Sequence, residues 1–220
     1  MSFEQNLGHI ALRYNGLAEQ ACCLSCGGAS ELAKAQPGET CLDLGSGRGE
    51  DILRLAEQVG PQGRAYGVDT AEAMIERARR TAQKLGIANA QFMQAAFDAL
   101  PLAPSSIDLV ISNCAINHAA DKNAVWREIY RVLRPGGRFV VSDIYALAEV
   151  PDEYRSDPQA VAECWAGAIE KPVYLASLTQ AGFADVTIKE ESTPYPKGKI
   201  EVASFTIAGR KPVSRCACGH

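Results

Sequence analysis

One glycine-rich turn constrains the fold of this chain more than any other feature of its sequence. The segment LDLGSGRGED, residues 42–51, places Gly45, Gly47 and Gly49 after an apolar run and before an amphipathic one. Glycine permits positive backbone φ angles and lets another group approach the main chain closely. A buried strand that turns through glycines into a helix is typical of doubly wound α/β folds, where such turns bind ligands.

The rest of the chain continues the alternation of short apolar runs and amphipathic segments. Strands are expected at residues 40–45, 65–69, 90–95, 107–113, 138–143, 184–190 and 201–210. A loop at 193–199 separates the last two, and a helix over 121–133 should stop before Pro135 and the glycines that follow it. This pattern predicts an α/β fold, a Rossmann-like seven-stranded and mostly parallel sheet with helices on both faces.

The organisation of the chain follows from this pattern. Residues 39–210 are expected to form the main domain, in which residues 144–180 lie outside the core alternation and supply a substrate cover. Residues 1–38 form an N-terminal cover that bears cysteines, and residues 211–220 form a flexible tail that also contains cysteine.

Composition narrows the class of partner. The 220 residues are 47% hydrophobic and carry a net charge of −4 without a block of lysine and arginine, so neither nucleic acid nor a membrane surface is an expected partner. A small-molecule substrate fits better, and the oligomeric state is open. The first residues resemble no secretory leader, so we expect a cytoplasmic protein whose eight cysteines remain thiols.

The glycine turn also discriminates between cofactors. The dinucleotide fingerprint requires glycine or alanine three residues after Gly47, where this chain has Glu50. An acidic side chain at a helix N-terminus disfavours a pyrophosphate, which makes NAD and FAD poor candidates. A nucleoside that carries a cationic sulfonium instead tolerates nearby carboxylates, and this description fits S-adenosylmethionine.

Further residues are candidates for that cofactor site. Asp69 ends the second expected strand, 20 residues after Gly49, where a carboxylate can accept hydrogen bonds from ribose hydroxyls. Two roles are open for Asp43, namely orienting the methionine amine or accepting from the loop backbone. Phe97 and Asp98 either meet the adenine or pack in a loop, and Asn113 should line the cleft. The predicted cofactor-binding residues are Asp43, Gly45, Ser46, Gly47, Gly49, Asp69, Thr70, Phe97, Asp98 and Asn113.

Longer stretches of the chain resemble a known family. PGETCLDLGSGRGEDIL, YGVDTAEAM and the segment from LPLAPSSIDLV to RFVVSDIY look like a class I S-adenosylmethionine-dependent methyltransferase. ISNCAIN, AECWAGAIEKPVYLASLTQAGF and the upstream YNGLAEQACC and LSCGG are similar, more narrowly, to the arsenite methyltransferases. The resemblance covers roughly residues 10–210 and implies a class I methyltransferase architecture.

The resemblance also implies a set of metalloid ligands. In that family cysteine thiolates hold trivalent arsenic, so Cys26 and Cys164 carry over as arsenic ligands and catalytic residues. Cys22 or Cys23 would be the third ligand or a resolving thiol. The family often has a further cysteine downstream, whereas this chain has none from 165 to 215, and Cys216 and Cys218 are candidates to replace it. An external thiol reductant of the glutathione or thioredoxin type would complete the cycle.

Other functions are compatible with parts of the same sequence. The acceptor could be a small organic molecule or another soft element, and a non-catalytic thiol-rich protein could bind a metalloid without methylating it. The remaining thiols have a simpler expected role, since Cys41 lies in the first strand and Cys114 follows Asn113, and both should pack in the core. The three histidines, His9, His118 and His220, are expected to be structural or exposed to solvent.

Overall fold

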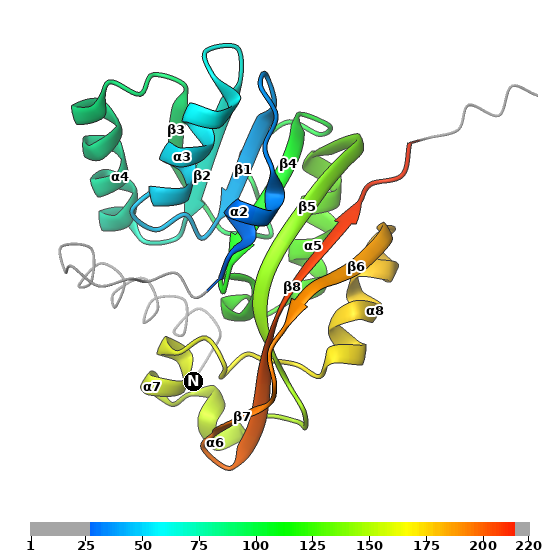
Figure 1. Ribbon diagram of the computed structural model, residues 1–220. Coiled ribbons are helices and arrows are strands. Elements are labelled where there is room, and N and C mark those ends of the chain that lie inside the picture. Colours follow the sequence, from blue (N-terminus) through cyan, green and yellow to red (C-terminus); the bar gives the residue numbers. More distant parts are fainter. Residues whose placement is uncertain (1–26, 214–220) are drawn as a thin grey trace, which may run out of the picture.

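The computed structural model describes residues 27–213 and shows a twisted sheet between two layers of helices (Figure 1). The strands are β1 (Thr40–Leu44), β2 (Arg64–Asp69), β3 (Ala90–Gln94), β4 (Ile107–Asn113), β5 (Leu133–Ala146), β6 (Ala184–Glu191), β7 (Tyr195–Lys197) and β8 (Ile200–Arg210). The helices are α2 (Ala29–Ala33), α3 (Glu50–Val59), α4 (Glu72–Leu85), the 3₁₀ helix η1 (Ile116–His118), α5 (Lys122–Val132), α6 (Asp152–Arg155), α7 (Pro158–Ala162) and α8 (Lys171–Ala181). None of these helices is long and apolar enough to cross a bilayer.

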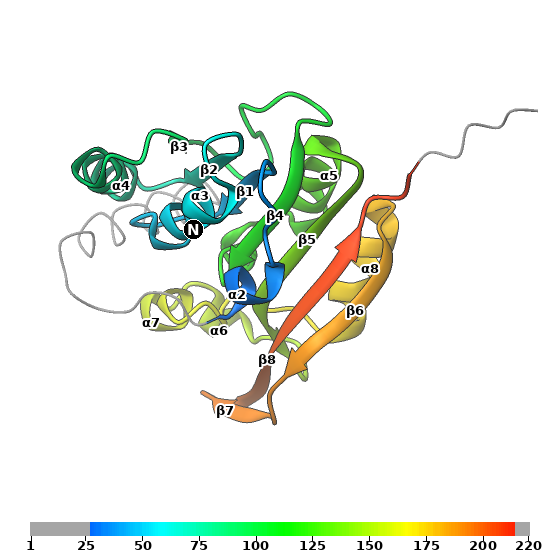
Figure 2. The same cartoon turned by 45° about the horizontal axis from the view of Figure 1, so that its top comes forward.

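The order of the strands confirms the predicted doubly wound sheet. Figure 2 shows the order β3-β2-β1-β4-β5-β8-β6 across the sheet, with β7 paired to β8. The strands β1 to β5 pair in parallel, whereas β8 is antiparallel to β5, β6 and β7. The chain winds outward in opposite directions from β1 and β4, so a crevice opens beyond the carboxyl ends of these two neighbours.

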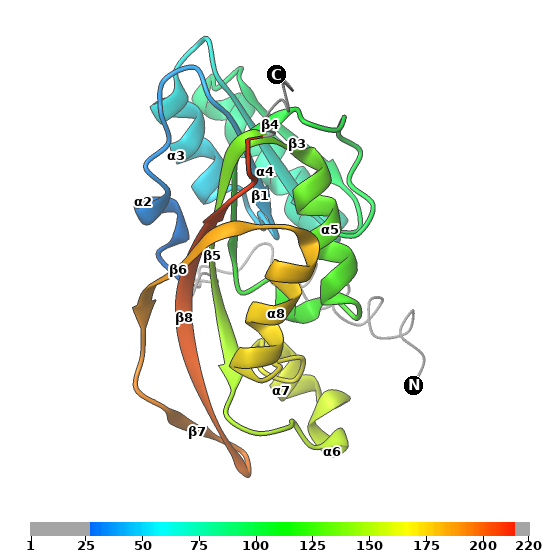
Figure 3. The same cartoon turned by 90° about the vertical axis from the view of Figure 1, so that its right-hand side faces the viewer.

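Side chains on alternate positions of the strands supply two separate cores. Leu42 and Val110 belong to a buried cluster with residues of α5 and α8, whereas Cys41 and Leu109 belong to one with residues of α2, α3 and α4. The period of two along each strand explains why neighbouring residues enter opposite layers. Figure 3 shows the sheet nearly edge-on, with α5 and α8 on one side and α2 and α3 on the other, which confirms the prediction of helices on both faces.

The boundary between α5 and β5 differs from the expected one. Asp121 Oδ1 accepts a hydrogen bond from the backbone N–H of Ala124 at 3.0 Å, and the helix that it caps ends at Val132. A residue that precedes proline avoids the helical region, so Arg134 and Pro135 prevent further turns. Strand β5 begins at Leu133, whereas we expected residue 138, and the register between β4 and β5 shifts between Ile107 and Leu109. The extra residues form an irregular entry to the strand.

The segment expected to be a loop at residues 193–199 is also partly regular. Residues Tyr195–Lys197 form β7, which pairs with Ile200–Val202 of β8 as a tight hairpin. The expectation of a loop was therefore wrong for these three residues. The reason is that β8 extends to the far tip of the sheet and offers its edge to the chain that enters it.

The part of the chain between β5 and α8 lies at the carboxyl end of β5. Helices α6 and α7 occupy this position in Figure 1, and Ala160 and Trp165 pack there with Ile144 and Val202. Helix α8 instead packs on α5 and belongs to the layer that covers the sheet. Of the predicted substrate cover at 144–180, only the residues between β5 and α8 thus lie beyond the end of β5. The division of the chain into cover, domain and tail remains a prediction.

Candidate functional site

The glycine turn forms the floor of the candidate site. The backbone N–H groups of Gly45 and Ser46 donate to the carbonyl of Val68 at 2.8 and 3.0 Å, which ties the turn to the end of β2. Gly49 has a φ of +83°, and a Cβ atom there would lie 2.6 Å from the Phe92 ring. A Cβ atom on Gly47 would instead meet open space. The turn therefore packs tightly at its end but leaves its middle glycine accessible to a bound group.

Asp69 holds the turn in this shape. Its Oδ2 accepts a hydrogen bond from the Gly47 N–H at 2.9 Å, and its Oδ1 accepts one from the Ala71 N–H at 2.9 Å. Burial raises the pKa of this carboxyl, while the two backbone hydrogen bonds oppose the shift. A carboxylate has about four lone-pair sites, so acceptor capacity remains after these bonds. The prediction that Asp69 also accepts from ribose hydroxyls is compatible with this geometry.

Acidic side chains surround the mouth of the turn. Asp43 is 4% exposed, and burial raises its pKa well above the usual value, with a further rise from the charges of Asp51 and Asp69. A small hollow of about 80 Å³ lies here, and its lining residues are Asp43, Gly45, Ser46, Gly47, Arg48, Glu50, Asp51 and Asn113. Within residues 27–213, the buried Ser46 hydroxyl has no hydrogen-bond partner. A ligand that carries a positive charge and a polar group would satisfy both features.

Asn113 has a structural task that the sequence did not reveal. Its Oδ1 accepts from the Ala29 N–H at 3.2 Å, and its Nδ2 donates to Asp51 Oδ2 at 2.9 Å. The other oxygen of Asp51 accepts from the Ser30 hydroxyl at 2.7 Å. Asn113 thus joins α2 and α3 to the end of β4, and it lines the hollow as well. Asp51 was missed because an acidic residue in a first helical turn has an ordinary explanation in the helix dipole.

The remaining predicted cofactor residues lie at different distances from the hollow. Phe97 is half-buried, and its ring lies 3.8 Å from the position of a Cβ atom on Gly45. Thr70 is half-buried next to Asp69, and its carbonyl accepts from Gln94 Nε2 at 3.1 Å. Asp98 is exposed and is not among the residues that line the hollow. Phe97 therefore lies near the turn, whereas the structure does not bring Asp98 into it.

Cys164 lies at the carboxyl end of β5, on the wall of a second cavity. This cavity measures about 390 Å³, and Asn117, His118, Lys122 and Arg155 also line it. The Asn117 Nδ2 donates to the carbonyl of Cys164 at 3.1 Å and to that of Ile144 at 2.7 Å. This amide therefore fastens the cysteine to the end of β5.

A buried carboxyl lies near the end of β5, one residue before Ile144. Asp143 is on β5, and its Oδ1 accepts from the Ile144 N–H at 2.9 Å while its Oδ2 accepts from the Tyr174 hydroxyl at 3.2 Å. Burial raises the pKa of Asp143 to about 7, against the effect of its hydrogen bonds and of the Lys122 charge. Burial also lowers the pKa of Lys122. This group was missed because one aspartate in an apolar strand has no motif around it.

The other predicted cysteine ligands lie outside the described residues. They are Cys22, Cys23, Cys26, Cys216 and Cys218. Gly27, which follows Cys26, lies against β5, since a Cβ atom on it would be 2.3 Å from Ser142 Cβ and 2.5 Å from Asn113 Oδ1. Ser142 and Ile144 are two residues apart on one strand, which corresponds to about 7 Å. The described chain therefore enters the fold close to the part of β5 that holds Cys164.

The two remaining described cysteines are core residues. Cys41 is fully buried in β1, and Cys114 is 6% exposed after β4. Burial raises the pKa of the Cys41 thiol to about 12, which makes it a poor nucleophile. Among residues 27–213, no group of three or more histidine, cysteine or acidic side chains is arranged to hold a metal ion.

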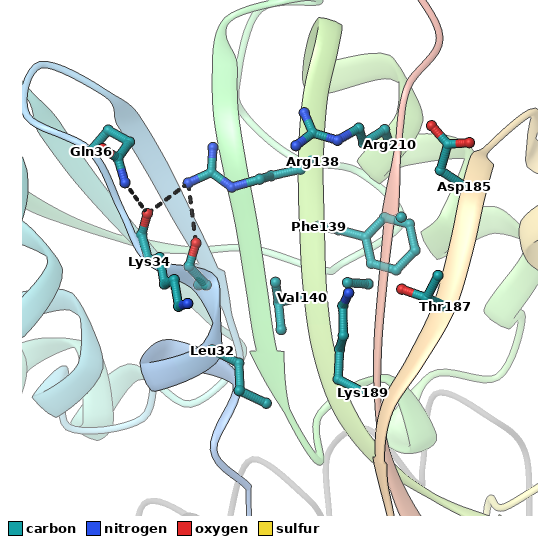
Figure 4. Close-up of a pocket in the computed structure, with 13 residues that line it drawn as sticks. Leu32, Lys34, Gln36, Arg138, Phe139, Val140, Asp185, Thr187, Lys189 and Arg210 are labelled. Carbon is teal, nitrogen blue, oxygen red and sulfur yellow. Dashed lines mark hydrogen bonds between the residues drawn. The ribbon is translucent and has the colours of Figure 1, made fainter.

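A third hollow lies on the face of the sheet, away from the glycine turn. It measures about 410 Å³ and extends between α2 and strands β5, β8 and β6. Figure 4 shows Arg138 reaching across it, where its Nη2 donates to the carbonyls of Ala33 and Lys34 at 3.2 Å. These two bonds anchor the end of α2 to the sheet, and Arg138 also forms an ion pair with Glu39. In the part of the chain that the structure describes, none of the predicted site residues lines this hollow.

Comparison with known proteins gives a consistent assignment. The family model described as a methyltransferase domain matches residues 35–194. The arsenite methyltransferase of Halobacterium salinarum is 43% identical over 199 residues, which are 86% of this chain and 51% of that protein. The human arsenite methyltransferase is 36% identical over 171 residues, or 73% of this chain and 42% of that protein. The chain thus spans about half the length of the curated relatives it matches.

A solved structure extends the comparison to the fold. The crystal structure of an arsenic(III) S-adenosylmethionine methyltransferase from Chlamydomonas reinhardtii superimposes with a TM-score of 0.74 at 31% identity. The match covers 97% of this chain and 74% of that one. On these grounds the chain belongs to the class I S-adenosylmethionine-dependent methyltransferases and, within them, to the arsenite methyltransferase family.

Proposed function

We propose that this protein transfers a methyl group from S-adenosylmethionine to trivalent arsenic held by cysteine thiolates. The observation that carries the proposal is the position of Cys164. This half-buried thiol lies at the carboxyl end of β5, on the edge of the sheet where the glycine turn ends β1. Transfer to arsenic requires that the thiol that holds it lie on the same edge of the sheet as the cofactor turn.

The glycine turn would hold the cofactor. The carboxylates of Asp43 and Asp69 suit a cationic ligand. The buried Ser46 hydroxyl would hydrogen-bond to a polar atom of the cofactor, and the open space at Gly47 would let the cofactor approach the backbone. When bound, S-adenosylmethionine supplies an electrophilic methyl group on a sulfonium. Phe97 and Asn113 flank the turn, and Asp98, which directly follows Phe97, would meet the adenine.

The cysteines would hold the acceptor. Trivalent arsenic is soft and prefers thiolates to oxygen or imidazole ligands. Cys164 would bind it together with Cys26, and Cys23 or Cys22 would supply the third thiolate, with Cys216 and Cys218 as further candidates. A thiolate-bound arsenic keeps its lone pair, which would form the new As–C bond as the methyl–sulfur bond breaks. The residues therefore need to position the acceptor, and a general base is not required.

The methylated arsenic would then be pentavalent and would need two electrons to return to the trivalent state. Two cysteine thiolates can supply these electrons by forming a disulfide, and we assign this step to the Cys22–Cys26 region. An external thiol of the glutathione or thioredoxin class would reduce that disulfide by exchange. Such a cycle needs a reducing compartment, so we place the protein in the cytoplasm.

One assay tests the proposal. The reduced protein is incubated with S-adenosylmethionine, arsenite and a thiol, and arsenic species are separated by chromatography with elemental detection. Methylated arsenic is the expected product. Calorimetry of S-adenosylmethionine binding is the control, because a protein that binds the cofactor without methylating arsenite has another acceptor. A protein that binds arsenite but not the cofactor would be a metalloid-binding protein without this activity.

A further inference from the structure

His118 is a side chain that contacts the thiol of Cys164. It ends η1, the short 3₁₀ helix after β4, and its backbone N–H donates to the Ala115 carbonyl at 3.0 Å. Its Nε2 lies 3.3 Å from Cys164 Sγ, although the two residues are 46 positions apart. Both line the cavity at the carboxyl end of β5. A hydrogen bond therefore links the imidazole to the candidate arsenic ligand.

The backbone of Cys164 is held in a conformation that side chains rarely adopt. Its φ is +64°, in the left-handed region, which costs a residue other than glycine about 1–3 kcal/mol. Two backbone hydrogen bonds hold it there, because its N–H donates to the Val161 carbonyl at 3.1 Å and Asn117 donates to its carbonyl. With the backbone held in this conformation, the direction of the bond that carries the sulfur is restricted.

The loop that carries Cys164 also closes tightly on η1. A Cβ atom on Gly167 would lie 2.0 Å from the Asn117 carbonyl oxygen, so only glycine allows this approach. The close contact brings the cysteine loop onto the helix that carries His118. The distance between Sγ and Nε2 is thus set by packing on both sides.

His118 also lies within electrostatic reach of Asp69. Burial raises the pKa of Asp69, and the charge of His118 is among the influences that oppose this rise. Asp69 in turn holds the glycine turn through its bonds to the Gly47 and Ala71 N–H groups. Asp143 and Lys122 are further charged groups on the side of Cys164.

We propose that His118 is a positioning residue that directs the Cys164 sulfur toward the cofactor by donating a hydrogen bond from Nε2. This role rests on the proposed function, in which Cys164 is an arsenic ligand. We assign the ring proton to Nε2, since a thiolate can only accept. His118, which the sequence led us to expect as structural or exposed, would thus fix one ligand of the acceptor without touching the methyl group.

Alkylation of Cys164 tests the hydrogen bond without any arsenic. The rate of its reaction with iodoacetamide is followed by peptide mass spectrometry in the wild type, His118→Leu and His118→Gln. Loss of the donor should slow the reaction about tenfold, because a charge-assisted hydrogen bond stabilises the thiolate. Glutamine keeps an N–H group and should restore most of the rate. Asn123→Leu, which changes another residue of the same cavity, should leave it unchanged.

The two proposals fail in different ways. Unchanged alkylation in His118→Leu would overturn the role of His118, whatever the methylation assay shows. Slower alkylation in a protein that methylates no arsenite would sink the proposed function and leave only the hydrogen bond between His118 and Cys164 standing. Where arsenite is methylated, His118→Leu should raise the KM for arsenite about tenfold and leave that for S-adenosylmethionine unchanged. If His118→Leu does not fold, His118→Ser is compared with His118→Gln in its place.

Discussion

Asp69 combines a structural and a binding role in a single carboxylate. Both of its oxygens accept backbone N–H groups, from Gly47 and from Ala71, and those bonds shape the turn. In Asp69→Asn an NH₂ group faces one of these donors, so a buried N–H loses its partner. We expect a loss of about 1–3 kcal/mol in the free energy of unfolding and at least about tenfold weaker binding of S-adenosylmethionine.

Urea unfolding and calorimetry measure these two effects. Asp152→Asn is the matched control, since the Asp152 side chain is 99% exposed and pairs with Arg155 at the surface. This control should change neither quantity. If Asp69→Asn binds the cofactor as tightly as the wild type does, Asp69 is not part of the binding site.

The raised pKa of Asp143 makes the stability of the folded protein depend on pH. Folding raises its pKa from 3.8 to about 7, so the native state holds this proton more tightly than the unfolded chain does. Its contribution to stability is complete below the ordinary pKa and is lost as the pH rises through about 7. The substitution Asp143→Asn would keep an acceptor for the Ile144 N–H and would place an NH₂ group near the Tyr174 oxygen. The asparagine side chain does not titrate, so this contribution to the pH dependence would be absent.

The test compares Asp143→Asn with the wild type at several pH values. The free energy of unfolding of Asp143→Asn, relative to that of the wild type, should increase by up to about 4 kcal/mol as the pH rises from 4 to 8. Asp152→Asn should show no such trend. Parallel stability curves for Asp143→Asn and the wild type would mean that Asp143 is not protonated in the folded state.

At the scale of elements, the passage from β1 through the glycine turn into α3 depends on close packing. Gly49 immediately precedes α3 with a φ of +83°, and a Cβ atom there would overlap the Phe92 ring of β3. Gly86 follows α4 with a similar φ of +70°, but its Cβ atom would meet open space. The two glycines share a backbone conformation and differ in their surroundings.

Alanine substitutions at Gly86 and Gly49 separate the backbone penalty of a positive φ from the cost of a clash with the Phe92 ring. Gly86→Ala should cost about 1 kcal/mol, which is the backbone penalty alone. Gly49→Ala should cost about 1–3 kcal/mol more, because the methyl group must displace the aromatic ring. Urea unfolding gives both values. Equal losses would show that Phe92 yields without cost and that the fit between the turn and β3 is loose.

For the whole molecule, the sequence predicted the features that depend on local pattern. The strands β1 to β4 begin and end within one residue of the expected positions, and the turn after β1 has the expected positive φ angles. Periodicity and glycine placement act over a few residues, and these are the signals that a sequence displays. The doubly wound order followed from the alternation of strands and helices.

Features that depend on contacts between distant segments were not predicted. The extension of β5 to Ala146 rests on its pairing with β8, some 60 residues later. The tie between Asn113 and α2 and the contact between His118 and Cys164 are of the same kind. No pattern within a short window marks such pairs, because each partner looks ordinary in its own surroundings.

In the proposed function, the glycine turn binds the cofactor and the Cys164 thiolate binds arsenic at the same edge of the sheet. Its most direct test is a single-turnover assay, in which methylarsenic is quantified by chromatography after excess protein meets S-adenosylmethionine, arsenite and a thiol. Cys164→Ser should lower the rate about 100-fold, since misplacing the acceptor by about 1 Å has effects of this size. Cofactor affinity should be unchanged, and Cys41→Ala, which alters a buried core thiol, should retain the rate. A Cys164→Ser protein that methylates arsenite as fast as the wild type would contradict this function of the thiol.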